Sequence, residues 1–116
     1  MSSPSFEARP WGSFTVLDDA MTHKVKTLTV NPGHRLSYQR HQHRAEHWFV
    51  VTGTATVTVD DKENTLERGE YIDIPMMAWH RIENRGDIDL TFVEVQHGAY
   101  FGEDDIERRS DDYGRA

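Results

Sequence analysis

Cysteine is absent from the 116-residue sequence, which excludes disulfide bonds, thiolate metal ligands and cysteine nucleophiles. Long apolar runs are missing too, since no segment approaches the roughly 18 residues that a membrane-spanning helix needs. The first residues, Met1 to Glu7, lack the apolar core of a secretory signal peptide. Any metal must therefore bind through nitrogen and oxygen, and we expect a cytoplasmic protein without a membrane partner.

Positive charge is scarce. The chain has 13 Lys and Arg against 20 Asp and Glu, which gives a formal net charge of −7. Such a charge repels phosphate backbones and argues against nucleic-acid binding. Six of the acidic residues lie between Glu103 and Asp112, in a segment that we expect to cap one end of the fold. The rest of the chain is closer to balance, so a small phosphorylated ligand is compatible with the total.

Helical periodicity is also lacking before residue 100. Turn signals of Gly, Pro and Asp recur at short intervals, and runs rich in Val, Thr, Ile, Phe and Tyr lie between them. Such runs occupy residues 24–30, 48–52, 55–59, 71–74 and 90–95. From Phe92 to Gln96, apolar and polar residues alternate with period two, as on a strand with one buried face. We predict a single all-β barrel.

The length suits one domain. We expect a flexible N-terminus over residues 1–8 and a single domain over residues 9–116. The tail is predicted to be irregular or to form a short helix within Glu103 to Arg109, whose acidic start and basic end suit a helix dipole.

Histidine is concentrated in one region. His34, His41, His43 and His47 fall within fourteen residues, and His80 follows later. On a strand, Gln39 and His41 project to the same face because side chains alternate. A turn after His41 brings Glu46 back along the neighbouring strand, and His80 reaches the same point from a third strand only if the sheet closes.

The spacing of these residues resembles the two motifs of the cupin superfamily. The first motif matches Gly33, Gln39, His41, Glu46 and Gly53, with Gln39 in the place of the usual first histidine. The second matches Gly69, Pro75, His80 and Asn84, with Met77 in the place of the second glycine. The resemblance implies a double-stranded β-helix, or jelly roll, that holds one divalent metal ion. With Met77 there, the turn need not have a positive φ.

The flanking segments resemble the type II mannose-6-phosphate isomerase domain. The resemblance extends from Arg9 to Arg115 and is carried by residues 9–12, 36–41, 44–48, 102–106 and 112–115. That domain usually forms the C-terminal part of bifunctional enzymes whose N-terminal part is a mannose-1-phosphate guanylyltransferase. The resemblance implies interconversion of mannose 6-phosphate and fructose 6-phosphate. The alternatives are a metal-containing cupin that binds a sugar phosphate without turnover and, third, another cupin metalloenzyme such as an oxygenase.

The predicted metal ligands are Gln39, His41, Glu46 and His80. Type I phosphomannose isomerases use a similar Gln, His, Glu, His set for zinc, which favours Gln39 as a ligand. A rival set consists of His41, His43, His47 and His80. Strand alternation argues against it, because Glu46 and His47 lie on opposite faces. Zinc leads among the metals that suit this set, followed by manganese, cobalt, nickel and iron.

The remaining site candidates are assigned by chemistry. The candidate catalytic residues are His43, His47 and Arg44, and the candidate substrate-binding residues are Lys26, Arg81, Trp11 and Glu94. An imidazole shuttles protons near neutral pH, and Glu94 is a weaker acid/base candidate. Arg and Lys bind phosphate, although Lys24 and Lys26 at period two are more typical of a solvated face. We also expect a homodimer.

Overall fold

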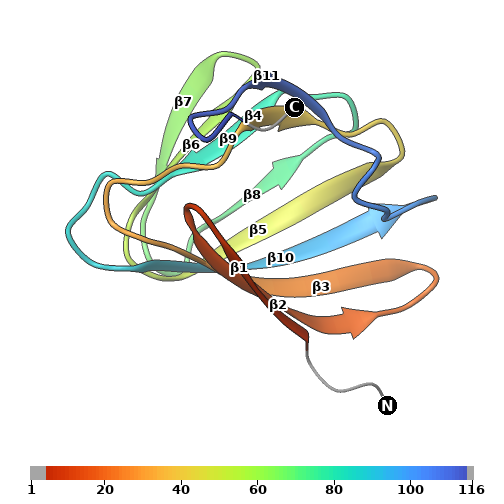
Figure 1. The fold of residues 1–116 in the computed structure, drawn as a ribbon, viewed down its shortest axis with the longest axis horizontal. Coiled ribbons are helices and arrows are strands. Elements are labelled where there is room, and N and C mark those ends of the chain that lie inside the picture. The colour runs from red at the N-terminus through yellow and green to blue at the C-terminus, as the bar shows by residue number, and fades with distance from the viewer. Residues whose placement is uncertain (1–4, 115–116) are drawn as a thin grey trace.

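The computed structural model describes residues 5–114, which contain eleven β-strands and no helix (Figure 1). The strands are β1 (Ser5–Arg9), β2 (Gly12–Asp19), β3 (His23–Val30), β4 (Tyr38–Arg40), β5 (Arg44–Thr52), β6 (Ala55–Val59), β7 (Lys62–Leu66), β8 (Tyr71–Ile74), β9 (His80–Glu83), β10 (Leu90–Gly98) and β11 (Glu107–Ser110). With no helix among these residues, no candidate for a helical membrane span is found in this part of the chain.

The strands form two antiparallel sheets that face each other (Figure 1). The larger sheet has the order β1-β2-β3-β10-β5-β8, and the smaller has the order β11-β4-β9-β6-β7. Strands that are distant in sequence are neighbours, since β10 lies between β3 and β5. The prediction of an all-β jelly roll is confirmed.

The interior between the sheets has an apolar half and a polar half. Along β10, the inward side chains change from Leu90 and Phe92 to Glu94 and Gln96, and all four are buried. In the neighbouring strand β3, the inward side chains change from apolar to polar at the same level. Leu28 is opposite Phe92, and Lys26 is opposite Glu94. The apolar half supplies the packing that stabilises the fold. The polar half is the place to look for chemistry.

Both ends of the chain differ from the expectation. The helix predicted within Glu103 to Arg109 is wrong, since Glu107–Ser110 forms β11 and pairs with β4. Pairing with an open sheet edge outweighs the weak local preference for a helix. At the other end, the segment expected to be flexible contributes residues 5–8 to β1, which pairs with β2. Residues 1–4 of that prediction lie outside the described residues.

The turn before β9 also departs from the expectation. Met77 has a φ of +70°, so the left-handed conformation of the usual glycine is kept without the glycine. A side chain in this conformation costs about 1 kcal/mol. The Met77 N–H donates to the carbonyl of His41 at 2.8 Å, and its side chain extends partly into solvent. This turn therefore holds the backbone of a predicted metal ligand.

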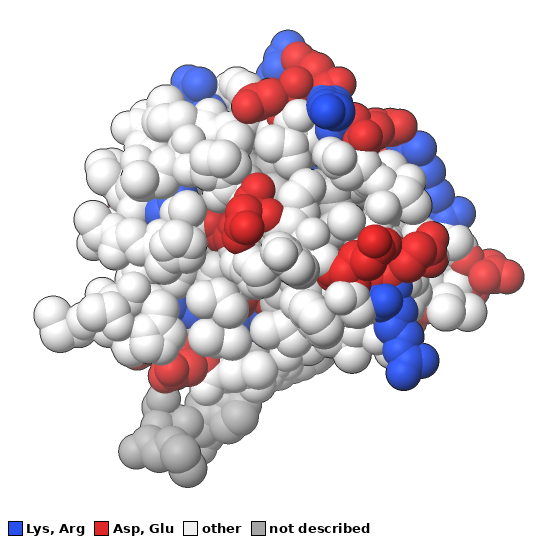
Figure 2. All heavy atoms as spheres, turned by 180° about the vertical axis from the view of Figure 1, so that it is seen from behind, with Lys and Arg blue, Asp and Glu red and all other residues white. Residues whose placement is uncertain are grey.

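Surface charge is unevenly distributed. On the face seen from behind in Figure 2, acidic and basic side chains gather mainly along the top and the right-hand side, with uncharged areas between them. Exposed acidic and basic groups also form ion pairs, such as that of Arg85 with Glu63. Exposed pairs of this kind contribute little stability.

Candidate metal centre

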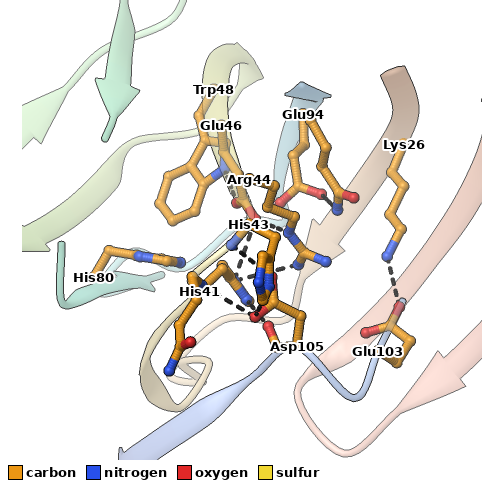
Figure 3. Close-up of polar contacts among 12 residues, drawn as sticks. Lys26, His41, His43, Arg44, Glu46, Trp48, His80, Glu94, Glu103 and Asp105 are labelled. Carbon is orange, nitrogen blue, oxygen red and sulfur yellow. Dashed lines mark hydrogen bonds and ion pairs between the residues drawn. The ribbon is translucent and has the colours of Figure 1, made fainter. Parts of the chain in front are cut away.

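Three predicted metal ligands meet in the polar half of the interior (Figure 3). His41 follows β4, Glu46 lies on β5 and His80 begins β9, so the residues come from both sheets. All three side chains are buried, and one ligand atom from each lies within 4.8 Å of the others. Two imidazoles and one carboxylate at this separation can hold a divalent ion.

Each of these side chains is oriented by a second group. The Nδ1 atom of His41 is 2.6 Å from the carbonyl oxygen of Asp105, and that of His80 is 3.0 Å from the carbonyl oxygen of Ala78. Because a carbonyl only accepts, both Nδ1 atoms carry the proton, and both Nε2 atoms present a lone pair rather than a proton. Trp48 Nε1 donates to Glu46 Oε1 at 2.9 Å. Partners of this kind are typical of metal-ligating residues.

The Nε2 atom of His80 is buried and has no hydrogen-bond partner among residues 5–114. A buried polar atom without a partner costs about 1 to 3 kcal/mol, so it calls for an explanation. A metal ion beside Glu46 and His41 provides one, because it would take up the lone pair. The donor set therefore fits a divalent cation.

Burial and neighbouring charges give these groups the protonation that metal binding needs. Burial lowers the pKa of His41 to about 4 and also lowers the pKa of His80. Burial opposes ionisation of Glu46, but attraction to His80, Arg44 and His41 outweighs it and lowers the pKa of this carboxyl. At neutral pH the imidazoles are neutral and the carboxylate is charged, so no proton has to leave before a metal binds.

Arg44 lies against the same ligand atoms. Its Nε donates to Glu46 Oε2 at 2.9 Å, and its Nη2 donates to His41 Nε2 at 3.2 Å. The guanidinium therefore provides the positive charge that a metal would supply, and it uses two of the same lone pairs. A metal ion bound to these atoms requires Arg44 to release them. The sequence pointed to Arg44 as a catalytic or phosphate-binding residue but not to this contact.

Gln39 lies on the same side as the three ligands. It is paired in register with His80, and cross-strand partners project to one face of a sheet. Gln39 also lines the cavity that His41 and Glu46 line. This position is compatible with the predicted fourth ligand.

The rival ligand set is not brought together. His47 points to the outer face of β5, where its Nδ1 is 2.7 Å from Asp73. His43 lies in the turn before β5, is largely exposed and is 3.3 Å from Asp105. Neither His43 nor His47 lines the cavity. Their positions therefore do not fit the proton transfer predicted for them. Alternation along β5 is the reason, since it directs Glu46 inward and His47 outward.

A cavity of about 80 Å³ adjoins His41 and Glu46. Its apolar lining includes Trp11, Phe14, Leu28, Leu36, Trp48 and Ile106, and its polar lining includes Arg9, Lys26, Ser37, Gln39, Arg44, Glu94, Gln96, Glu103 and Arg108. Of the predicted substrate-binding residues, Trp11, Lys26 and Glu94 therefore lie beside the candidate metal centre.

Two predicted basic residues take unexpected positions. Lys26 is buried on the inner face of β3, so the solvated-face reading of this lysine is wrong. Arg81 does not line the cavity: it donates to the carbonyl of Leu36 and to Ser110 and so holds the C-terminal segment. The substrate-binding role predicted for Arg81 does not fit this position. Alternation along β9 explains the position of Arg81: His80 points inward, so the next residue, Arg81, points outward.

Glu94 is protonated at neutral pH. Burial and the nearby charge of Glu46 raise its pKa to about 8, and the two carboxyl groups share a hydrogen bond. Glu94 Oε1 also accepts a hydrogen bond from Gln96 Nε2 at 2.6 Å. The cavity therefore contains a carboxylic acid that titrates near neutral pH.

The pH dependence of stability tests this protonation. Because the pKa of Glu94 rises from 4.5 to about 8, the native protein binds an extra proton between these values, and its free energy of unfolding falls as pH rises through this window. Glu94→Gln keeps a donor for Glu46 and does not titrate. We expect its stability relative to the parent to increase by up to about 1.4 kcal/mol per pH unit between about pH 5 and 7. Urea unfolding with a chelator measures this, and a pH-independent difference would contradict it.

Sequence reasoning missed the residue that joins the C-terminal segment to the metal-ligand turn. The Asp105 carboxylate accepts the backbone N–H groups of Gln42 and His43, both at 3.0 Å, while its carbonyl accepts from His41. One residue thus fixes both the turn and a ligand. No local pattern indicates a contact across more than sixty residues. Gln96 and Glu103 were also missed as cavity residues, although alternation along β10 would have found Gln96.

Comparison with known proteins identifies the family. Residues 5–111 match the family described as mannose-6-phosphate isomerase C-terminal. The chain is 54% identical over 107 residues to the alginate biosynthesis protein AlgA of Pseudomonas aeruginosa, and 50% identical over 107 residues to the mannose-1-phosphate guanylyltransferase of Escherichia coli K12. In both cases it covers 92% of its own length and 22% of the relative. The chain thus spans about a fifth of these proteins.

Solved structures agree on the fold. The capsular polysaccharide assembling protein CapF of Staphylococcus aureus matches with a TM-score of 0.80 at 24% identity, covering 93% of this chain and 33% of that one. KdgF of Halomonas sp. matches with a TM-score of 0.76 at 13% identity, covering 89% and 90%. At these identities the likeness concerns the fold alone. The family match, the two cupin motifs and the assembled ligands lead to one conclusion: the chain belongs to the mannose-6-phosphate isomerase C-terminal family.

Proposed function

We propose that this protein binds one divalent metal ion and interconverts mannose 6-phosphate and fructose 6-phosphate. The observation that carries the proposal is the buried group of His41, Glu46 and His80, in which His80 Nε2 has no partner. Membership of the isomerase family supports the reaction type. Zinc is the metal that we propose, because a Gln, His, Glu, His set suits it.

The reaction moves a proton between two neighbouring carbons of the sugar, so it needs an electrophile and an acid/base group. A metal ion at this centre supplies Lewis acidity that polarises the sugar carbonyl. The acid/base group is Glu94, since it lines the cavity and has a pKa of about 8. A group that titrates near the working pH both gives and accepts protons effectively. Gln96 Nε2 donates to Glu94 Oε1 and so fixes the carboxyl group.

The charge of the cavity favours an anionic sugar. Four basic and three acidic side chains line it, and one of the acidic ones, Glu94, is protonated at neutral pH. The remaining positive excess contrasts with the net charge of −7 of the whole chain. A phosphate group is therefore attracted to this cavity although the protein as a whole is acidic.

A coupled isomerase assay tests the proposal. Protein reconstituted with zinc and incubated with mannose 6-phosphate is expected to form fructose 6-phosphate, and a chelator is expected to stop the reaction. Glu94→Gln is expected to lower kcat about 100-fold or more, because it removes the acid/base group. Saturable binding without product, across several divalent metals, would contradict the isomerase and favour a sugar-phosphate-binding cupin.

A further inference from the structure

Lys26 is a buried cation with one ionic partner in the structure. Its side chain is only 6% exposed, and its Nζ donates to Glu103 Oε1 at 3.0 Å (Figure 3). The ammonium group also lies over the Phe14 ring, 4.3 Å from the centroid. A buried ammonium without an anion is unfavourable by several kcal/mol, so Lys26 needs a negative partner at all times.

Glu103 is the more exposed member of this pair. Its side chain is 59% exposed, which lets its carboxylate return to water at little cost. The pair is therefore asymmetric: the lysine cannot leave the cavity, but the carboxylate can be exchanged for another anion.

A second cation faces the same space. Arg44 is buried, lines the same cavity as Lys26, and has an Nη1 atom without a hydrogen-bond partner. The charge of Glu103 is attracted by both Lys26 and Arg44, so the two cations are near the same carboxylate. An unpaired guanidinium N–H beside an ammonium group matches the oxygens of a phosphate.

The segment that carries Glu103 closes the cavity. We call residues 99–106 the C-terminal arch; it connects β10 in the larger sheet to β11 in the smaller one (Figure 1). One end is fixed where the Ala99 N–H donates to the His43 carbonyl, and the other where the Asp105 carboxylate binds the turn at Gln42 and His43. Glu103 lies between these two anchors.

Cavity size indicates that the part of the arch with Glu103 has to move. The inner cavity of about 80 Å³ is well below the roughly 300 Å³ of a small ligand pocket. On the other side of the arch lies a hollow of about 480 Å³, lined by residues that include His43, Tyr100 and Asp104. Ile106 lines both spaces, so the arch is the wall between them. Displacing Glu103 outward would enlarge the inner cavity toward this hollow.

From these observations we propose that Lys26 and Arg44 form the binding site for the phosphate group of a sugar phosphate, and that the Glu103 carboxylate occupies this site until the ligand displaces it. The inference rests on the proposed function for the identity of the sugar phosphate. The internal carboxylate keeps the buried lysine paired in the free protein, and it makes binding depend on an anionic group in the ligand.

Calorimetric titration of the metal-free chain with inorganic phosphate tests the site. Glu103→Gln removes the competing charge, so we expect it to tighten phosphate binding about 10-fold. We expect the same 10-fold gain in affinity for mannose 6-phosphate and no gain for mannose, which lacks the phosphate. Adding Lys26→Met to this variant is expected to cancel the gain. Glu107→Gln is the matched control, because Glu107 lies in the neighbouring strand and pairs with the more exposed Arg40.

An affinity for phosphate that stays within about twofold of the parent in Glu103→Gln, or that falls, overturns the inference. If this variant does not fold, Glu103→Asp serves instead, since its shorter side chain weakens the contact with Lys26 and is expected to give a smaller gain. Because the titration measures binding without turnover, it tests the anion site separately from the isomerase activity. Tighter phosphate binding without isomerase product leaves the anion site intact and removes the proposed function. Isomerase activity with unchanged phosphate affinity supports the proposed function and overturns the anion site.

Discussion

Replacing His41 and His80 together with alanine is expected to lower the affinity for zinc at least about 100-fold, because two of the three assembled ligands are lost. The remaining Glu46 is already paired with Arg44, so it offers little to a metal alone. Equilibrium dialysis followed by elemental analysis measures the bound metal. Isomerase activity is expected to disappear with it.

The control for this double variant replaces His34 and His97, which lie outside the metal centre. His34 Nδ1 is 2.7 Å from the Tyr113 hydroxyl, and His97 is exposed near the end of β10. Their replacement by alanine is expected to leave metal content unchanged. Equal zinc content in the His41, His80 variant and the parent would remove the centre from consideration, provided that both proteins give the same circular dichroism spectrum.

Replacing Arg44 with methionine is expected to destabilise the metal-free protein by about 3 kcal/mol, because the buried Glu46 carboxylate loses its paired cation. Methionine keeps much of the apolar stem and removes the charge. Zinc supplies a positive charge at the same oxygen, so we expect zinc to recover most of this loss. Zinc should also bind more tightly to the variant than to the parent, since it no longer displaces the guanidinium.

Chemical unfolding with and without zinc measures both effects. Arg85→Met is the matched control, because Arg85 makes two ion pairs that are exposed, and its loss is expected to cost less than about 1 kcal/mol with no dependence on zinc. If Arg44→Met loses the same stability with and without zinc, the arginine and the metal do not share the site.

The meeting of His41, Glu46 and His80 could be predicted because their spacing resembles the two cupin motifs. Alternation on strands directs Glu46 inward and His47 outward, and the structure follows this rule at both residues. The same rule sets the face of the strand on which Lys26 and Arg81 lie. The sequence alone, however, does not say which face of β3 or β9 is buried. That depends on which strands become neighbours, so the sequence left Lys26 open between substrate binding and a solvated face, and Arg81 was expected in the cavity.

What could not be predicted depends on contacts between distant parts of the chain. Asp105 reaches back to His41 and its turn, and Glu103 reaches Lys26 across 77 residues. The tail containing both residues was expected to be irregular or to form a short helix, since its charge pattern suits a helix locally. Pairing of β11 with β4 decides otherwise. At Met77 the local expectation was also overruled. The turn keeps a positive φ, although a side chain disfavours this conformation.

The place of β10 in the larger sheet has a consequence for synthesis on the ribosome. Strands β3 and β5 are complete by residue 52, but β10, which joins them, begins only at Leu90. The two strands therefore emerge with unpaired edges and wait for β10. Such edges invite pairing with other chains. Completion of the larger sheet is thus tied to the synthesis of β10, and Asp105, which fixes the metal-ligand turn, arrives later still.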